Sequence, residues 1–323
     1  MASATEIVLE RRLLRRRLTF WRNLAFLALS VAIGFLVLGR EETSLLFSGN
    51  HIARISIEGT ITEWREQLEL IKKIKDNKKV TGVLLFINSP GGTTSGGEAL
   101  FEQIRSVAQK KPVVAQFGTI AASAGYIVGL AADHIVSRGN TITGSIGVIV
   151  QWPEVSDLLA KLGVKMNEVK SGELKASPSP FMPADDASKA VLKEMIDDGY
   201  LWFSHLVETR RGIKIADVPG LDKGRIFSGR EALKLRLVDE IGGEEQAKLW
   251  LEEKAGLKKD LDIIDWKPEH RENWGFFSSL GGAILWLVNI LGLEMRKIYS
   301  NSVLGQTSGL DGLVSVWQPP STN

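Results

Sequence analysis

The chain has 323 residues, of which 44% are hydrophobic and 24% charged, a composition typical of globular proteins that excludes a disordered or collagen-like chain. It has no cysteine, which excludes disulfides, thiolate zinc sites and a cysteine nucleophile, and its four histidines lack metal-ligand spacing. Residues 1–22 hold six Arg and two Glu, a net charge of +4 within a chain whose total is +2. The remainder therefore carries −2 and is not a basic nucleic-acid-binding domain.

The first element in chain order is an apolar segment, Leu24–Gly39, of sixteen residues without a charge. As a helix it would rise ~24 Å, so Phe20 and Trp21 are needed for it to cross a hydrocarbon core of ~30 Å. The arginines ahead of it predict a cytoplasmic N-terminus and an exported chain behind it. A cleaved signal peptide and, from Arg16-Arg17, a twin-arginine signal are the alternatives. Because no A-x-A-like cleavage site follows, we favour a retained transmembrane anchor.

Strands and helices alternate after a short linker, and this alternation predicts an α/β fold with a mostly parallel sheet. Three segments have the apolar pattern of strands, and two have the spacing of amphipathic helices. The expected strands are His51–Ile57, Val80–Ile87 and Pro112–Phe117, and the expected helices are Glu63–Lys78 and Gly97–Gln109.

Shorter elements are expected further along the chain, around a polar loop from Ser171 to Pro183. The expected strands are Ser145–Val150 and Met166–Val169, and the expected helices are Glu154–Leu162, Ala184–Arg211, Glu231–Leu235 and Glu244–Glu253.

A second apolar segment, Trp274–Leu293, contains twenty residues without a charge. Its length permits a second membrane span, but serine, glycine and asparagine lower its hydrophobicity. An interfacial helix, or a helix packed on another subunit, explains it at least as well.

Two glycine-rich turns are candidates for chemistry. Asn88–Gly92 follows a buried strand, and Gly91 and Gly92 can turn their amides toward a ligand because glycine tolerates positive φ. Taken alone, this turn is more often a plain strand exit. No Gly-Lys-Ser/Thr follows, which excludes a phosphate-binding P-loop.

The second turn, Gly118–Tyr126, places Ser123 among small residues before an apolar helical stretch. This arrangement resembles a nucleophile at a strand-to-helix turn, although Ala121 replaces the first glycine of the usual G-x-S-x-G pattern. A helix N-terminus also offers free amides and the positive end of the helix dipole. Without further context, a serine here is more often a helix cap or a close-packing residue.

A serine nucleophile needs a base. His134 lies eleven residues after Ser123, where the chain enters a strand, and is best explained as a structural histidine. Lysine in its neutral form is a competent base, but spacing alone does not select Lys175 among the many lysines.

Four motifs in one order and spacing resemble the signal peptide peptidase A family of serine peptidases, in its short, single-repeat form. They are Asn88–Gly92, Ala121–Tyr126, Thr143–Val148 and Lys170–Lys175. The resemblance extends from about residue 52 to about 256, through Gly224–Ala232 and Leu237–Gly242, and omits the tail. It implies a fold shared with Clp peptidase and crotonase, built of repeated β-β-α units.

The resemblance also implies site residues, position by position. Ser123 matches the nucleophile and Lys175 the general base of a Ser-Lys dyad, while Ser145 matches the residue that orients the lysine ammonium. The backbone N–H groups of Gly91 and Ala124 match the oxyanion hole. The family commonly has glycine where this chain has Ala124; the amide survives that change, but its methyl group narrows the adjoining pocket. No cofactor and no metal are implied.

These implications predict a serine endopeptidase, anchored in the inner membrane by a single pass, with its catalytic domain on the extracytoplasmic (periplasmic) side. Its expected substrates are hydrophobic peptides, especially remnant signal peptides. The expected assembly is a homo-oligomeric ring, an octamer, in which neighbouring subunits share the dyad. A crotonase-type acyl-CoA enzyme and an inert membrane scaffold are the rival functions. The expected divisions are a basic segment 1–22, an anchor 23–40, a linker 41–50, a peptidase domain 51–256 and a tail 257–323.

Overall fold

The computed structural model describes residues 17, 20–24, 26, 49–268 and 314–316. Contacts divide the chain into two units, Met1–Gly49 and Asn50–Asn323. Within the described part of the chain, no helix combines the length and apolar character that a membrane crossing requires. Most of the predicted anchor and all of the apolar segment 274–293 lie outside the described residues.

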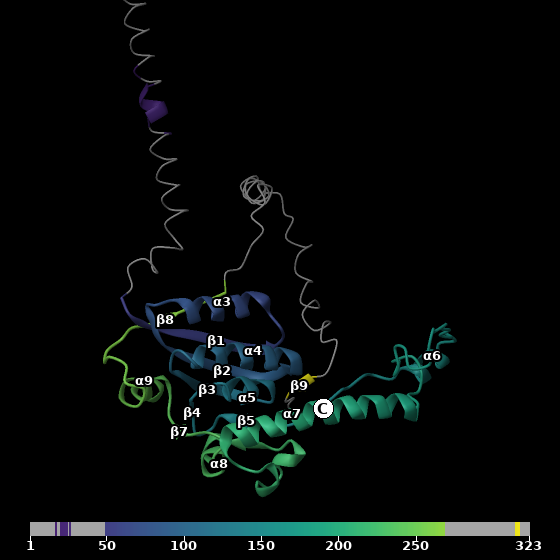
Figure 1. Cartoon of the computed structure of the whole chain (residues 1–323). Coiled ribbons are helices and arrows are strands. Elements are labelled where there is room, and N and C mark those ends of the chain that lie inside the picture. The colour runs from purple at the N-terminus through teal and green to yellow at the C-terminus, as the bar shows by residue number, and fades with distance from the viewer. Residues whose placement is uncertain (1–16, 18–19, 25, 27–48, 269–313, 317–323) are drawn as a thin grey trace, which may run out of the picture. The chain divides into compact units, whose positions relative to one another are not determined.

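The second unit is built on one twisted sheet whose described strands follow the order β6-β5-β3-β2-β1-β8, with β4 and β7 joined through β3 and β9 joined to β2 (Figure 1). Most pairs are parallel; β5–β6 and β2–β9 are antiparallel. The strands are β1 (His51–Ile61), β2 (Val80–Thr93), β3 (Val113–Ala122), β4 (His134–Ser137), β5 (Ile142–Gly144), β6 (Ile226–Ser228), β7 (Glu240–Ile241), β8 (Ile263–Asp265) and β9 (Val314–Val316). The predicted α/β fold with a mostly parallel sheet is confirmed.

Helices cover both faces of this sheet, as a parallel sheet requires. The described helices are α3 (Arg65–Asp76), α4 (Thr94–Ala108), α5 (Ala124–Gly129), α6 (Ser156–Lys161), α7 (Asp186–Arg211), α8 (Gly229–Lys234) and α9 (Glu244–Glu253). Because side chains alternate along a strand, Val83 and Leu85 join the core under α3, α4 and α5, whereas Leu84 joins the core under α9. The sheet is therefore buried on both sides.

Two predicted strands are absent. At Ser145–Val150 the chain leaves the sheet, because β5 ends at Gly144 and Ser145 has a φ of 53°. Met166–Val169 has no regular structure. Of the apolar residues in these two segments, Ile146 is buried, but Ile149, Met166 and Val169 are exposed in the single chain. The other predicted elements exist, but β1, β2 and β3 extend four to six residues beyond their expected ends; α9 coincides with its prediction.

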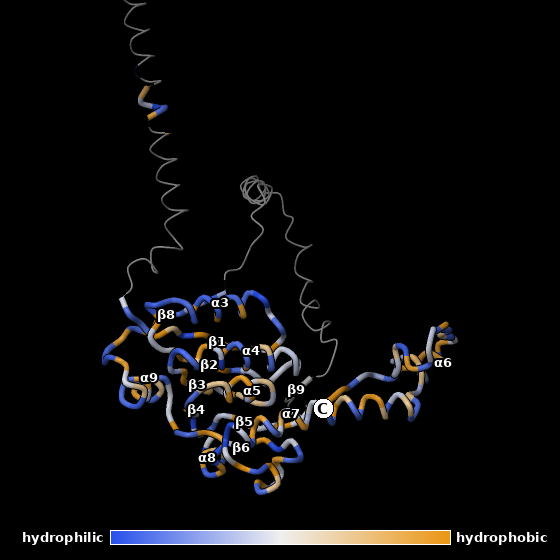
Figure 2. Tube along the Cα trace, viewed as in Figure 1, coloured by the Kyte–Doolittle hydropathy of each residue, from blue (hydrophilic) through white to orange (hydrophobic). Residues whose placement is uncertain are grey.

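Most of the segment between β5 and α7 forms an arm together with the first half of α7, and this arm projects away from the sheet (Figure 1). Apolar residues lie along it in Figure 2, and many of their side chains are exposed. They include Leu158, Leu162, Val164, Met166, Val169, Leu174, Phe181, Val191 and Met195. A monomeric protein rarely exposes so many apolar side chains together, so this arm has the composition of a contact surface.

Candidate active site

Ser123 lies at a strained strand-to-helix turn. It follows β3 and precedes α5, and it has φ 57° and ψ −122°. A positive φ is uncommon for a residue with a Cβ atom and often marks a functional site. Its hydroxyl does not cap α5. Helix capping, the usual role of a serine here, therefore does not explain the residue.

Ser145 lies beside Ser123 because their two strands end in register. Ala122 of β3 pairs with Gly144 of β5, and each serine is the next residue in its chain segment. The N–H of Ser123 donates to the carbonyl of Gly144 at 2.9 Å. Both serines have positive φ, and the Ser145 N–H is held by the carbonyl of Arg225 at 3.0 Å. Two residues that the resemblance assigned to one site thus meet at one edge of the sheet.

The turn at Asn88–Gly92 is part of β2, so it is more than a strand exit. Gly91 has a φ of 120°, a conformation that favours glycine. Its N–H donates to the Ser89 hydroxyl at 3.1 Å, so the predicted oxyanion amide has an internal partner in this structure. Asn88 accepts hydrogen bonds from the backbone N–H groups of Thr119 and Ile120, which ties the turn to β3.

Helix α5 packs directly against this turn. A Cβ atom added to Gly125 would lie 2.8 Å from the carbonyl oxygen of Ser89. Ala124, the residue with the second predicted oxyanion amide, is the first residue of α5 and is fully buried. The two predicted donors therefore belong to neighbouring elements in tight contact.

The described strand of the tail, β9, pairs antiparallel with the end of β2. Val316 is opposite Gly91, Ser315 opposite Gly92 and Val314 opposite Thr93. The edge of β2 beside Gly91 therefore accepts an extended backbone. This is the way in which a sheet edge binds a peptide by strand addition.

The structure does not bring Lys175 to Ser123 within a single chain. Ser123 is 1% exposed in the core, whereas Lys175 is exposed and belongs to the stretch between α6 and α7, which lies in the arm (Figure 1). Its N–H donates to the carbonyl of Gly172 at 3.1 Å. Of the predicted residues, Ser123, Ser145, Gly91 and Ala124 gather at the sheet, and Lys175 alone lies apart.

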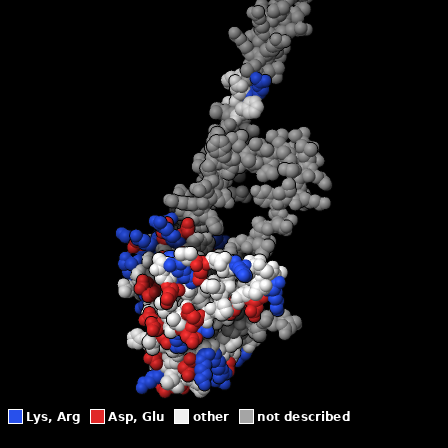
Figure 3. All heavy atoms as spheres, turned by 90° about the vertical axis from the view of Figure 1, so that its right-hand side faces the viewer, with Lys and Arg blue, Asp and Glu red and all other residues white. Residues whose placement is uncertain are grey.

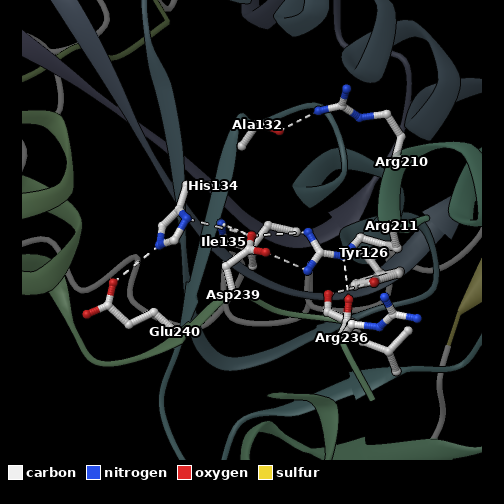
Figure 4. A network of polar contacts seen from close by, with 10 residues as sticks. Tyr126, Ala132, His134, Ile135, Arg210, Arg211, Arg236, Asp239 and Glu240 are labelled. Carbon is white, nitrogen blue, oxygen red and sulfur yellow. Dashed lines mark hydrogen bonds and ion pairs between the residues drawn. The ribbon is translucent and has the colours of Figure 1, made fainter. Parts of the chain in front are cut away.

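A partly buried network of polar contacts connects α5 with residues near β4, β7 and the end of α7 (Figure 4). Tyr126 of α5 is fully buried and donates its hydroxyl to the carbonyl of Leu237 at 2.7 Å. Burial raises the pKa of Tyr126, so the hydroxyl stays protonated and remains a donor. Arg211 forms two hydrogen bonds with Asp239, and Asp239 also accepts from the backbone N–H of Ile135.

His134 takes part in this network as a structural residue. Its Nε2 atom lies 3.2 Å from a carboxylate oxygen of Glu240, and its ring stacks on Trp250 with centroids 5.0 Å apart. These contacts hold β4 against β7 and α9, which agrees with the structural role expected for this histidine.

Two arginines that sequence reasoning missed hold the other end of α5. Arg210 donates to the carbonyls of Leu130 and Ala132 at 2.8 and 2.7 Å, and Arg105 donates to the carbonyl of Ala131 at 2.9 Å. These carbonyls follow the helix C-terminus, where cationic donors are stabilising. No local signal in the sequence marks contacts between elements so far apart in the chain.

Acidic and basic side chains are intermixed over the face of the molecule that Figure 3 shows. Among the described residues, no cluster of three or more histidine or carboxylate side chains is suited to hold a metal ion.

Comparisons with known proteins agree with this fold. Sequence profiles of Peptidase family S49 and of Clp protease match residues 105–258 and 48–141, respectively. A candidate protease of Synechocystis sp. is 37% identical over 235 residues, which cover 71% of this chain and 84% of that protein. A candidate protease of Methanocaldococcus jannaschii is 36% identical over 213 residues, 66% of this chain and 68% of that protein. A candidate signal peptide peptidase, SppA, of Enterococcus faecium is 34% identical over 252 residues, 73% and 72% of the two chains.

The S49 profile spans the segment that contains Ser123, Ser145 and Lys175, and the Clp protease profile spans β1 to β3. Relatives with the names of proteases match across two thirds or more of their own length. The chain is therefore a peptidase of family S49, as its resemblance to the signal peptide peptidase A family predicted.

Proposed function

We propose that this chain is a membrane-anchored serine endopeptidase that hydrolyses hydrophobic peptides, especially remnant signal peptides, with a Ser-Lys dyad of Ser123 and Lys175. The observation that carries the proposal is the pair of strained serines, Ser123 and Ser145, at adjoining strand ends. A serine on a strained backbone, next to a glycine-rich turn, suits a nucleophile that attacks a carbonyl group whose developing oxyanion is stabilised by backbone amides.

In the proposed reaction, neutral Lys175 removes the proton of the Ser123 hydroxyl while the serine oxygen attacks a peptide carbonyl. The amides of Gly91 and Ala124 stabilise the tetrahedral oxyanion, each at ~2.7–4 kcal/mol by analogy with other enzymes. The Gly91 N–H must then exchange its bond to Ser89 for one to substrate. The lysine ammonium protonates the leaving amine, and water hydrolyses the acyl-enzyme with lysine again as base.

We propose that the dyad forms between neighbouring subunits of a ring, an octamer. Two observations support this. The stretch that contains Lys175, between α6 and α7, belongs to the arm, whereas Ser123 lies at the end of β3; and the arm exposes many apolar side chains. A neighbouring subunit that packs against the arm would bury those side chains, and Lys175 would then lie beside the Ser123 of that neighbour. Such an interface is heterologous, and its rotation must close for a ring to form.

The pairing of β9 with the end of β2 supports an extended substrate. A substrate chain bound along Gly91–Thr93 would form main-chain hydrogen bonds and pass the Gly91 amide. Anchoring by Leu24–Gly39 would raise the local concentration of membrane-held peptides at the site.

A peptidase assay with an unfolded apolar polypeptide tests the proposal. Wild-type protein should hydrolyse it, and the Ser123→Ala and Lys175→Arg variants should be nearly inactive, since guanidinium does not act as a base. Activity of the wild type should rise with pH, because the proposed mechanism needs its general base in the neutral form. Full activity of Ser123→Ala, or a rate that does not change between about pH 5 and 9 with chemistry rate-limiting, would contradict the dyad.

A further inference from the structure

A second lysine closes the loop that carries Lys175. The Nζ atom of Lys170 lies 3.0 Å from the hydroxyl oxygen of Ser177 and 2.7 Å from a carboxylate oxygen of Glu168. The Ser177 hydroxyl in turn donates to the carbonyl of Glu173 at 3.2 Å. The two ends of the segment 170–177 are thus joined by a hydrogen bond between the side chains of Lys170 and Ser177.

The two lysines of this loop have opposite environments. The side chain of Lys170 is 17% exposed, beside a cavity of about 520 Å³ that Ser171, Gly172 and Ser177 also line. Lys175 is exposed. An ammonium group has three donor hydrogens and no acceptor, and Lys170 directs donors to Glu168 and Ser177. The ammonium group of Lys170 therefore makes contacts within the loop, whereas that of Lys175 is exposed and accessible to groups outside the loop.

The backbone between them forms compact turns. The N–H of Lys175 donates to the carbonyl of Gly172 at 3.1 Å, and the N–H of Ser177 donates to the carbonyl of Leu174 at 3.3 Å. Ala176 has a φ of 56°, which a residue with a Cβ atom adopts only when its surroundings enforce it. The Lys170–Ser177 contact closes the loop around this residue.

We propose that Lys170 is a positioning residue for the general base, Lys175. Its contacts with Glu168 and Ser177, and the hydrogen bond from Ser177 to Glu173, fix the loop in the conformation from which Lys175 reaches a serine nucleophile. The inference rests on the proposed function and deepens it. Lys170 itself accepts no proton from substrate or nucleophile. An error of ~1 Å in the position of a catalytic group costs ~10²-fold in rate, so loss of this closure should lower turnover by about ten- to a hundred-fold.

Lys170→Met, which keeps most of the chain length and removes the donors, is the primary variant, measured in the full chain with an apolar polypeptide substrate. We expect kcat to fall about ten- to a hundred-fold with little change in KM, because Lys175 acts on the transition state. The pH midpoint of activity should not move. Lys170→Arg keeps the charge and the donors and should recover most of the turnover. Lys72→Met, at an exposed lysine of α3 outside the arm, is the control and should behave as wild type.

Ser177→Ala keeps the protein testable if Lys170→Met fails to fold. It should lower kcat less than Lys170→Met, and the double variant should lose no more than Lys170→Met alone, since both act through one contact. Wild-type turnover of folded Lys170→Met, or independent addition of the two losses, would overturn the inference. So would a Lys170→Arg variant as inactive as Lys175→Arg, because Lys170 would then itself be the proton acceptor. Full activity of Lys175→Arg would instead refute the proposed dyad, a different outcome from all of these.

Discussion

Gly125 is the position where one methyl group tests whether the contact between α5 and β2 sets the geometry of the site. A Cβ atom at residue 125 would lie 2.8 Å from the carbonyl oxygen of Ser89 and 3.3 Å from its Cβ atom. Carbon-to-oxygen contacts are normally no shorter than ~3.3 Å. In Gly125→Ala, α5 and the Asn88–Gly92 turn must therefore separate by about 0.5 Å, so that the contact between the new Cβ atom and the Ser89 carbonyl oxygen lengthens from 2.8 Å to the normal ~3.3 Å.

This separation has two measurable costs. Overpacking of this kind destabilises by ~1–3 kcal/mol, which is a loss of several degrees in Tm for a domain of this size. The same movement would shift the Ala124 amide relative to the Gly91 amide. Since a displacement of ~1 Å costs ~10²-fold in rate, half of that should cost about ten-fold, or ~1.4 kcal/mol of barrier.

The assay compares kcat and Tm of Gly125→Ala with those of Gly199→Ala. Gly199 lies within α7, and an added Cβ atom would meet its nearest neighbour, Val148, at an ordinary 3.4 Å. The same chemical change there should preserve activity and stabilise slightly, since alanine favours helix. Wild-type kcat in a destabilised Gly125→Ala variant would show that the α5–β2 contact does not control the oxyanion geometry.

Three further predictions address stability and the tail. Tyr126→Phe leaves the buried carbonyl of Leu237 without its donor and should cost ~1–3 kcal/mol in the free energy of unfolding, measured by denaturant titration; no loss would show that the network does not support α5. The hydrogen bond from Arg54 lowers the pKa of Asp265, so this ion pair stabilises the fold above the ordinary Asp pKa and its contribution is lost as pH falls below about 4. Because both side chains are partly exposed, Asp265→Asn should cost at most ~1 kcal/mol at pH 7 and nothing at low pH; a constant difference between the unfolding curves would contradict the assignment. A chain that ends before the strand Val314–Val316 should have a lower KM for peptides and an unchanged kcat, since that strand occupies the proposed substrate edge; an unchanged KM would mean that the edge is not the binding site.

The sequence predicts the sheet well wherever burial is local and periodic. Val80–Ile87 forms most of β2, because a short apolar run is typical of a strand that is buried on both faces. Glu244–Glu253 is a helix with the expected bounds, because its apolar residues recur with helical spacing. The pattern fails at Met166–Val169, whose apolar residues are exposed in the arm. Apolar spacing indicates which side chains favour burial, but it does not show whether they pack against their own chain or against another subunit.

Only part of the candidate site could be predicted from the sequence. The small residues around Ser123 indicated a special turn, and the structure has a strained φ there. The adjacency of Ser145 follows from strand register, which residue spacing alone does not give. Lys175 was selected by family resemblance alone, and the hydrogen bond from Gly91 to Ser89 has no signature in the sequence.

The central claim is that one subunit supplies Ser123 and its neighbour supplies Lys175, and mixing two inactive variants tests it most directly. Ser123→Ala and Lys175→Ala should each be inactive alone. Co-expressed in equal amounts, they should restore about a quarter of wild-type activity, since a working site needs an intact serine from one subunit and an intact lysine from the next, each with a chance of about one half in random heterologous assembly. If both variants co-assemble and activity stays at background, the dyad lies within one chain and the shared site is refuted.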